Sequence, residues 1–392
     1  MNKKNYYFGH FLSPSELNKF IGPAVSANRM QLGLLTNLAL DNNFNIYSIY
    51  PIASFPTNKQ LILFGKKCKE PFIFKMLPMI NIFLIKQFFT EFIIFWKLIF
   101  TSNKHSVILT FNPYVELSTP VLFAKKFKRF STLCIVADIP TTIPTTYSKF
   151  KKWVRKKEIK RYCNNLKKYD GLVVLNKEVI NNFCFNGPYY VMNGGVSNYE
   201  LQEASFLPPE LHDNDSILFS GALEEYNGIL TLINAFNTIK NKKIKLFIAG
   251  DGSLKEFVEN EASKNPNIVF LGYLTHEDIL NWQKKVGLLI NPRPIDSFSM
   301  RLSFPSKLFE YMLSGTPVMS TKHNELVGKY EDILFLTNDD IVSIASSLDY
   351  FFKLDYKKRY SKVQKGYEFL KNNMSYDVHS IKISELMEKI RK

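Results

Sequence analysis

Residues 291–318, NPRPIDSFSMRLSFPSKLFEYMLSGTPV, carry the clearest structural signals in this chain. The apolar residues 286–290 predict a strand, and the two prolines of NPRP end it. A polar loop follows, and the letters FPSK at 304–307 predict a helix start, because proline is favoured in a first turn. Gly315 is typical of the position that follows a helix, and the apolar residues after it predict another strand. This alternation predicts an α/β fold.

The predicted helix would carry Lys307 and Glu310 on one face, because they are three residues apart. A helix N-terminus presents unpaired N–H groups, which favour phosphate, and Lys307 would add a full positive charge there. Glu310, one turn deeper, would accept hydrogen bonds from ribose hydroxyls. The pair is therefore a candidate site for a nucleoside diphosphate. The alternative is a solvated surface pair, which is the commoner meaning of this spacing by itself.

The order of strand, NPRP, loop, SFPSK, helix and SGTP resembles the donor-binding signature of the retaining GT-B glycosyltransferases in the group numbered family four. Within that group it is similar to the branch that builds bacterial capsular polysaccharides and exopolysaccharides. The resemblance covers the C-terminal half and extends more faintly into the N-terminal half. It implies two Rossmann-like domains, each a doubly wound parallel sheet, with the active site in the cleft between them.

The same resemblance implies the reaction. A sugar would move from a nucleotide-diphosphate sugar, UDP-linked as is usual in the family, to a hydroxyl of a lipid-linked or oligosaccharide acceptor with retention of anomeric configuration. It implies no cofactor, no obligatory metal and no covalent enzyme intermediate. The residues themselves favour no metal site, since the D-x-D at 213–215 lies in a presumed linker and the histidines lack ligand spacing.

By this resemblance, nine residues are expected to bind the nucleotide sugar: Gly22, Gly221, Gly272, Tyr273, Leu274, Arg293, Ser306, Lys307 and Glu310. Three of them, at 272–274, would lie against the base. The chain also departs from the family pattern: Ala222, Asn227 and Leu302 stand where members usually carry Arg, Lys and Glu. The sugar therefore cannot be carried over from the family.

Three residues are candidates for catalysis: Arg301, Lys307 and Asp138. A departing diphosphate needs positive charge, and Arg293, Arg301 and Lys307 are the cations expected to replace the missing ones. Asp138 follows an apolar strand and would orient or deprotonate the acceptor. The alternative for Asp138 is a cap or turn aspartate, which this position fits equally well.

Strands and helices alternate along the N-terminal half, which predicts a parallel sheet covered on both faces. The predicted domains are an acceptor-binding domain at 1–196, a nucleotide-sugar-binding domain at 197–370 and a tail helix at 371–392 that crosses back. Residues 196–215 are polar and are predicted to link the domains. Ligands of such sheets bind beyond the carboxyl ends of the strands, where Gly22, Asp138 and residues 193–195 are expected.

Composition predicts an ordinary globular chain: 46% of the 392 residues are hydrophobic and 22% are charged. No apolar run of spanning length and no secretory signal is expected. The four cysteines form no CxxC pair and are interpreted as reduced thiols of a cytoplasmic protein.

Positive charge is concentrated in the N-terminal half. Residues 1–196 hold 27 Lys and Arg against 9 Asp and Glu, a net charge of +18, whereas the whole chain carries +16. The run SKFKKWVRKKEIKR at 148–161 sets Phe150, Trp153 and Val154 among eight cations, which suits a helix held against anionic lipid headgroups. The prediction is peripheral attachment to the inner face of the cytoplasmic membrane. The alternative is a solvated basic face with a few apolar anchors.

Residues 71–100, PFIFKMLPMINIFLIKQFFTEFIIFWKLIF, are rich in Phe, Ile and Leu but are interrupted by four charges. They are too charged to span a bilayer and too apolar for an ordinary exposed helix. A helix buried in the domain is favoured over one that rests in the membrane interface.

Two other functions fit parts of the sequence. A GT-B epimerase or phosphorylase would share the nucleotide site without needing a basic, membrane-facing half. Alternatively, the basic half would bind nucleic acid and the second half would sense a nucleotide. The sequence contains no recognisable nucleic-acid module, so no nucleic-acid partner is expected.

Overall fold

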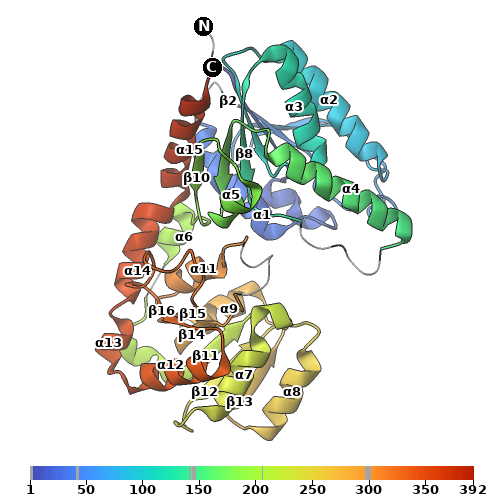
Figure 1. Cartoon of the computed structure of the whole chain (residues 1–392). Helices are drawn as coiled ribbons and strands as arrows, with labels where there is room; N and C mark the ends of the chain where they lie inside the picture. The colour runs from blue at the N-terminus through green and yellow to red at the C-terminus, as the bar shows by residue number, and fades with distance from the viewer. Residues whose placement is uncertain (1–2, 41–43, 141–142, 144–146, 205, 296–301) are drawn as a thin grey trace. The chain divides into compact units, whose positions relative to one another are not determined.

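The computed structural model describes residues 3–40, 44–140, 143, 147–204, 206–295 and 302–392 (Figure 1). The chain forms two compact units. The N-terminal unit comprises Met1–Gly195 and Tyr376–Lys392, and the C-terminal unit comprises Val196–Ser375. Within the described part of the chain, no helix has the combined length and apolarity needed to cross a membrane.

The N-terminal unit is built on an eight-stranded sheet in the order β10-β9-β8-β7-β1-β2-β5-β4. All neighbouring strands are parallel except β4 and β5, which are antiparallel. Every residue of β1, β7, β8 and β9 is buried, as expected for parallel strands covered on both faces. The strands are β1 (Asn5–Gly9), β2 (Phe44–Ser48), β4 (Lys66–Cys68), β5 (Phe74–Met76), β7 (Val107–Phe111), β8 (Ser131–Val136), β9 (Gly171–Val174) and β10 (Tyr189–Val191). A separate antiparallel pair joins β3 (Ile62–Leu63) to β6 (Met79–Ile80).

Helices of the N-terminal unit pack in two groups. Helix α1 packs against α15, whereas α2 packs against α3 and α3 against α4, as Figure 1 also shows. The helices are η1 (Pro14–Lys19), α1 (Val25–Leu38), α2 (Ile85–Thr101), α3 (Val115–Lys128), α4 (Lys149–Leu166), α5 (Glu178–Phe183) and α15 (Tyr376–Ile390).

The C-terminal unit has a six-stranded, fully parallel sheet in the order β13-β12-β11-β14-β15-β16. Counted within the unit, this is the order 3-2-1-4-5-6 of the Rossmann fold. The strands are β11 (Asp213–Ser220), β12 (Lys245–Ala249), β13 (Ile268–Gly272), β14 (Val286–Asn291), β15 (Val318–Thr321) and β16 (Phe335–Thr337). The order reverses between β11 and β14, and ligands of such sheets bind at that point.

One face of this sheet packs against apolar side chains of α7 and α12, which belong to the core of the unit. The helices are α6 (Asn198–Glu203), η2 (Pro209–Leu211), η3 (Glu225–Asn227), α7 (Ile229–Thr238), α8 (Lys255–Lys264), α9 (His276–Gln283), α11 (Lys307–Leu313), α12 (Ile341–Lys353), α13 (Tyr356–Tyr360), α14 (Val363–Phe369) and η4 (Leu370–Met374). The predicted helix after FPSK is therefore α11, and Gly315 after it has a left-handed φ of 80°.

Two sequence predictions about local structure were wrong. Residues 71–100 are not one helix, because α2 starts at Ile85 and the residues before it include β5 and β6. Pro71 and Pro78 explain this, since proline removes a helical hydrogen bond. The presumed linker at 196–215 contains α6, and its Ser197 and Glu200 form a reciprocal capping box. The letters S-x-x-E at this place signal such a helix start.

Candidate functional site

A cavity of about 310 Å³ in the C-terminal unit lies where the strand order reverses. The ends of the neighbouring strands β11 and β14 supply part of its wall, and the residues that lead into α11 supply another part. Four of the predicted nucleotide-sugar residues line it together: Gly221, Arg293, Ser306 and Lys307. The remaining lining residues are Phe219, Ser220, Ala222, Tyr226, Asn227, Ile290, Asn291, Pro305 and Tyr311.

Two cations give this cavity its charge. The Lys307 ammonium donates a hydrogen bond to the Ser220 carbonyl at 2.5 Å, and Arg293 Nε donates to Asn227 Oδ1 at 3.1 Å. Desolvation is the largest cause and lowers the pKa of both groups. For Lys307, the charge of Glu310 raises the pKa and the charge of Arg293 lowers it, and the pKa stays below its usual value. The described lining residues include no carboxylate. Because the lining of the cavity supplies no negative charge to either cation, a ligand with negative charge would interact favourably with both.

Asn227 therefore has a role that its place in the family pattern did not predict. It stands approximately where members carry a lysine, but here its side chain accepts a hydrogen bond from Arg293. The interaction holds the guanidinium at the cavity, and the Arg293 carbonyl accepts a further hydrogen bond from Thr321 Oγ1 at 2.6 Å. Arg293 thus belongs to the loop after β14, and polar partners hold both its side chain and its backbone carbonyl.

The cavity wall depends on a close approach between two loops. Gly228 has a φ of 78°, and a Cβ built on it would lie 1.9 Å from the Pro292 carbonyl oxygen. Glycine alone permits both this conformation and this distance. The loop after β11 can therefore approach NPRP, which brings Asn227 to Arg293.

Tyr311 also lines the cavity, although no feature of the sequence singled it out. Its hydroxyl is 3.0 Å from Ser220 Oγ and donates to the Ser220 carbonyl at 3.2 Å. Burial, chiefly, raises the pKa of Tyr311 to about 12, so the phenol stays neutral at physiological pH. Tyr311 and Lys307 share the carbonyl of Ser220, which fixes the end of β11 at the cavity.

Glu310 is on α11 but is not among the residues that line the cavity. Its Oε1 accepts a hydrogen bond at 2.7 Å from Nε2 of the buried Gln283, and the backbone carbonyl of Gln283 accepts one from Thr316 Oγ1 at 2.6 Å. The carboxylate is thus positioned by the residue that ends α9. Its predicted contact with a ribose remains a prediction.

The predicted base-contacting residues lie at the end of β13, two strands from β11. Gly272 has a φ of 70°, and its carbonyl accepts a hydrogen bond from the Gly250 N–H at 2.9 Å. Tyr273 is 82% exposed. Gly272, Tyr273 and Leu274 do not line the cavity. Arg301, the remaining predicted cation, lies outside the described residues.

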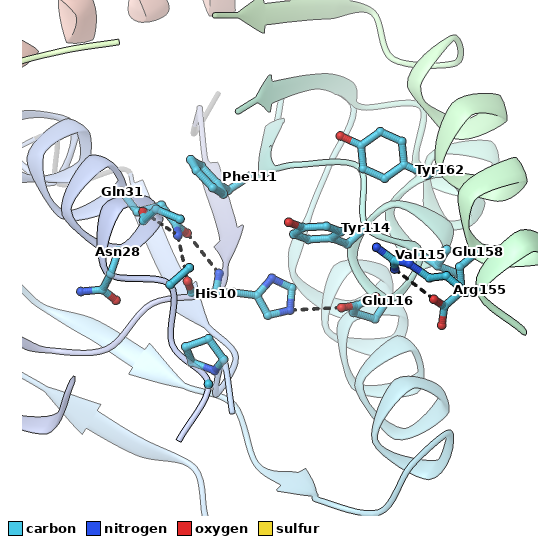
Figure 2. Close-up of a pocket in the computed structure, with 14 residues that line it drawn as sticks. His10, Asn28, Gln31, Phe111, Tyr114, Val115, Glu116, Arg155, Glu158 and Tyr162 are labelled. Carbon is cyan, nitrogen blue, oxygen red and sulfur yellow. Dashed lines mark hydrogen bonds and ion pairs between the residues drawn. The ribbon is translucent and has the colours of Figure 1, made fainter. Parts of the chain in front are cut away.

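A second pocket, of about 330 Å³, lies in the N-terminal unit (Figure 2). It occupies the corresponding place in that sheet, because β1 lies between β2 and β7 and the order reverses there. Gly22, the predicted loop glycine, lines it. The other lining residues are His10, Ala24, Ala27, Asn28, Gln31, Pro51, Phe111, Tyr114, Val115, Glu116, Arg155, Glu158 and Tyr162.

An ion pair forms the polar centre of this second pocket, as the dashed line in Figure 2 marks. His10 Nε2 lies 3.3 Å from Glu116 Oε1. Burial, the largest single cause, would raise the pKa of Glu116. The hydrogen bond and charge of His10, a backbone hydrogen bond and the charge of Lys86 together leave the pKa lowered. The other ring nitrogen, His10 Nδ1, is buried and has no hydrogen-bond partner among the described residues. That nitrogen is available to a ligand hydroxyl.

The surroundings hold His10 in place. Its backbone N–H donates to Gln31 Oε1 at 3.1 Å, and Gln31 Nε2 donates back to the His10 carbonyl at 2.8 Å. A second ion pair, Arg155 with Glu158 at 3.1 Å, lies at the pocket wall on α4. Carboxylates, a guanidinium and an imidazole in one pocket can pair with the donors and acceptors of a polyhydroxylated ligand.

Asp138, the predicted acceptor-side residue, is exposed and is not among the lining residues. Its backbone is fixed, since its N–H donates to Asn112 Oδ1 at 3.1 Å and its carbonyl accepts from the Tyr162 hydroxyl. Tyr162 does line the pocket. His10 and Glu116 were missed, because they follow different strands and come together only when β1 and β7 pair. A histidine directly after the first strand was the available signal.

Comparisons with known proteins agree with this architecture. Residues 214–353 match the family of glycosyl transferases group 1, which is less than half of the chain. No curated protein matches the sequence significantly. Sucrose-phosphate synthase from Thermosynechococcus elongatus superposes with a TM-score of 0.65 at 14% identity over 99% of both chains.

Two trehalose-related structures resemble this chain about as closely as the sucrose-phosphate synthase does. The E. coli trehalose-6-phosphate protein bound with UDP-2-fluoro glucose gives a TM-score of 0.67 at 13% identity, over 99% of this chain and 100% of that one. Trehalose-6-phosphate synthase, studied as a glycosyl transfer with retention, gives 0.67 at 11% identity over all of both chains. The chain therefore has the α/β fold of the GT-B glycosyltransferases, with two Rossmann-like domains, and its residues 214–353 carry the sequence pattern of glycosyl transferases group 1.

Proposed function

We propose that this protein transfers a sugar from a nucleotide-diphosphate sugar to a hydroxyl group of an acceptor, with retention of anomeric configuration. The observation that carries the proposal is the cavity at the reversal of the C-terminal sheet, where Arg293 and Lys307 meet without a lining carboxylate. The match of residues 214–353 to glycosyl transferases group 1 supports it. The similarity in fold to a protein bound with UDP-2-fluoro glucose is consistent with a uracil nucleotide.

The two cations would act on the leaving group. Breaking the bond between the sugar and the diphosphate leaves an additional negative charge on the phosphate oxygens, while the anomeric carbon acquires oxocarbenium character. Arg293 and Lys307 would stabilise that charge from fixed positions, because polar partners already hold both side chains. Removal of one such preorganised group typically costs about 10²- to 10³-fold in kcat. In this proposal the protein cations supply the charge, and no metal or other cofactor is required.

The polar pocket of the N-terminal unit is proposed to bind the acceptor. In the neutral imidazole, with the proton on Nε2 facing the Glu116 carboxylate, Nδ1 of His10 can accept a hydrogen bond from an acceptor hydroxyl. The pair would orient the reacting hydroxyl and stabilise positive charge on the imidazole if it takes the proton. The acceptor is proposed to be lipid-linked or an oligosaccharide, in the synthesis of a bacterial surface polysaccharide such as capsule or exopolysaccharide, at the inner face of the cytoplasmic membrane.

Nucleotide binding tests the proposal. Calorimetric titration with UDP, GDP, ADP and CDP is expected to show selective binding of one nucleotide, with UDP favoured. Arg293→Ala and Lys307→Ala should each weaken that binding, whereas Lys255→Ala, an exposed change on α8, should leave it unchanged. Absence of binding to any of the four nucleotides by the folded protein would overturn the proposal.

A further inference from the structure

Helix α2 exposes one apolar face. Phe88, Phe92, Trp96 and Phe100 follow one another at intervals of four residues, so they lie along one side of the helix. Phe88 is 63% exposed, Phe92 62% and Phe100 77%. The opposite side of α2, with Ile94 among its buried residues, packs into the N-terminal unit. Four large aromatic residues in a row on the exposed side of a helix are unusual for a surface that meets only water.

The aromatic side chains continue onto the neighbouring helix α3. Phe95 links the two helices, with its ring centroid 5.2 Å from that of Phe123 and 6.3 Å from that of Phe127. Phe123 and Phe127 are both exposed and contact each other at 5.4 Å. We call the exposed members of this set the aromatic surface: Phe88, Phe92, Trp96, Phe100, Phe123 and Phe127.

A basic pocket of about 600 Å³ adjoins the aromatic surface, and Phe123 lines it too. Five cations surround this basic pocket: Lys125, Lys126, Arg129, Lys168 and Lys392. Asp170 pairs with Lys125 at 2.8 Å and lies 3.8 Å from Lys392, so one carboxylate offsets part of the charge. Lys126, Arg129 and Lys168 remain exposed, which leaves the pocket with a clear excess of positive charge.

We propose that the aromatic surface and the basic pocket together bind the surface of an anionic phospholipid bilayer. The phosphates of the lipid headgroups would enter the basic pocket, while the rings of α2 and α3 lie at the level of the glycerol and upper acyl chains. Aromatic side chains favour that interface, and each Lys or Arg near an anionic membrane strengthens binding by about fivefold. The inference extends the proposed function, because it gives a surface by which the protein would reach a lipid-linked acceptor.

Charge and geometry favour a bilayer over the other partners. A second copy of the chain would bring together two units that are both strongly basic, and their repulsion opposes association. A nucleic acid would satisfy the cations, but the row of exposed rings on α2 does not suit a phosphate backbone. A bilayer presents negative charge above apolar chains, which matches a basic pocket beside an aromatic surface. Most of the aromatic surface belongs to residues 71–100, for which the sequence left contact with the membrane interface as the alternative. The main sequence prediction of membrane contact concerned residues 148–161.

Vesicle sedimentation tests the aromatic surface without nucleotide or acceptor. We expect the wild-type protein to bind vesicles of phosphatidylcholine with phosphatidylglycerol and not those of phosphatidylcholine alone. The double variant Phe92→Ser/Phe100→Ser should bind the anionic vesicles about tenfold more weakly, because two rings no longer leave water. Tyr350→Ser, which removes a similarly exposed ring from α12 of the C-terminal unit, should bind as the wild type does.

Two double variants with the same change in net charge test the basic pocket. Lys126→Glu/Arg129→Glu should reduce anionic-vesicle binding by at least about tenfold. Lys242→Glu/Lys243→Glu changes the net charge equally in the C-terminal unit and should bind as the wild type does. Four results would overturn the proposal: no binding of the wild type to anionic vesicles, equal binding to neutral vesicles, equal loss in both charge variants, or loss of vesicle binding when RNA is added as competitor. UDP titration of the same variants keeps this test separate, since failed vesicle binding with intact UDP binding leaves the proposed function standing.

Discussion

Replacement of Lys307 by methionine is the most informative single change in the C-terminal cavity. Methionine keeps a long unbranched side chain and removes the ammonium. The Ser220 carbonyl loses the hydrogen bond at 2.5 Å but retains the one from the Tyr311 hydroxyl at 3.2 Å. The end of β11 therefore keeps a partner, and we expect little change in the free energy of unfolding.

The expected loss of binding affinity comes from the contact between Lys307 and the diphosphate of the ligand. A hydrogen bond to a charged group contributes about 1.5–3 kcal/mol net, which corresponds to a roughly 10- to 150-fold change in Kd. A Coulomb energy of about 4 kcal/mol, for unit charges about 4 Å apart at an effective dielectric constant of about 20, sets an upper bound. Uridine has no phosphate, so its binding should not change.

Calorimetric titration with UDP and with uridine measures both effects on the same protein. We expect Lys307→Met to weaken the binding of UDP roughly 10- to 150-fold and to leave the binding of uridine unchanged. The matched control is Lys264→Met, because Lys264 pairs with Glu261 at 2.8 Å on the exposed surface of α8. The role given to Lys307 would be refuted if the variant bound UDP as tightly as the wild type does. It would also be refuted if the binding of UDP and the binding of uridine weakened equally.

Three further predictions concern pH, the cavity wall and the acceptor pocket. Desolvation, chiefly, lowers the pKa of Lys307 in the free protein, and a bound diphosphate favours the charged form. The affinity for UDP should therefore be full below this lowered pKa and should fall as the pH rises through it. The fall should begin at a lower pH than it would for an ordinary lysine. Lys307→Arg should remove that part of the pH dependence in titrations carried from neutral to alkaline pH. Gly228→Ala should lower the free energy of unfolding by about 1–3 kcal/mol more than Gly328→Ala in urea denaturation, because both have a left-handed φ but only the Cβ at 228 meets a backbone oxygen, at 1.9 Å. Equal losses would show that the approach of the two loops is not tight. Glu116→Gln breaks the ion pair with His10 and should lower kcat/KM for the acceptor by about 10- to 100-fold in a transfer assay while UDP binding stays the same; a parallel loss of UDP binding would contradict an acceptor role.

The signals around residues 291–318 were local, and they predicted local structure well. Pro305 and Gly315 bound the helix that became α11, and the apolar residues before NPRP became β14. Arg293 and Lys307 could be selected from sequence because both stand beside these motifs, and the structure brings them to one cavity. Their partners could not be selected, since Asn227 comes from a separate loop and reaches Arg293 only through the close approach at Gly228.

The N-terminal pocket shows where sequence reasoning fails. His10 and Glu116 are far apart in the chain, and only the parallel pairing of β1 with β7 brings them within 3.3 Å. Neither residue stands in a motif. Helix α2 shows a related difficulty: its apolar residues occupy both faces, so composition favoured a buried helix. Which of the two faces packs inward depends on α3 and the sheet.

Sugar transfer itself tests the central claim most directly. The protein would be incubated with labelled UDP-sugars and a bacterial lipid extract, and the products analysed by chromatography and NMR. The account predicts label in a glycolipid or oligosaccharide, release of one UDP for each sugar transferred, and retained configuration at the anomeric carbon. Label that appears as an epimerised nucleotide sugar or a free sugar phosphate, with no labelled acceptor, would contradict it.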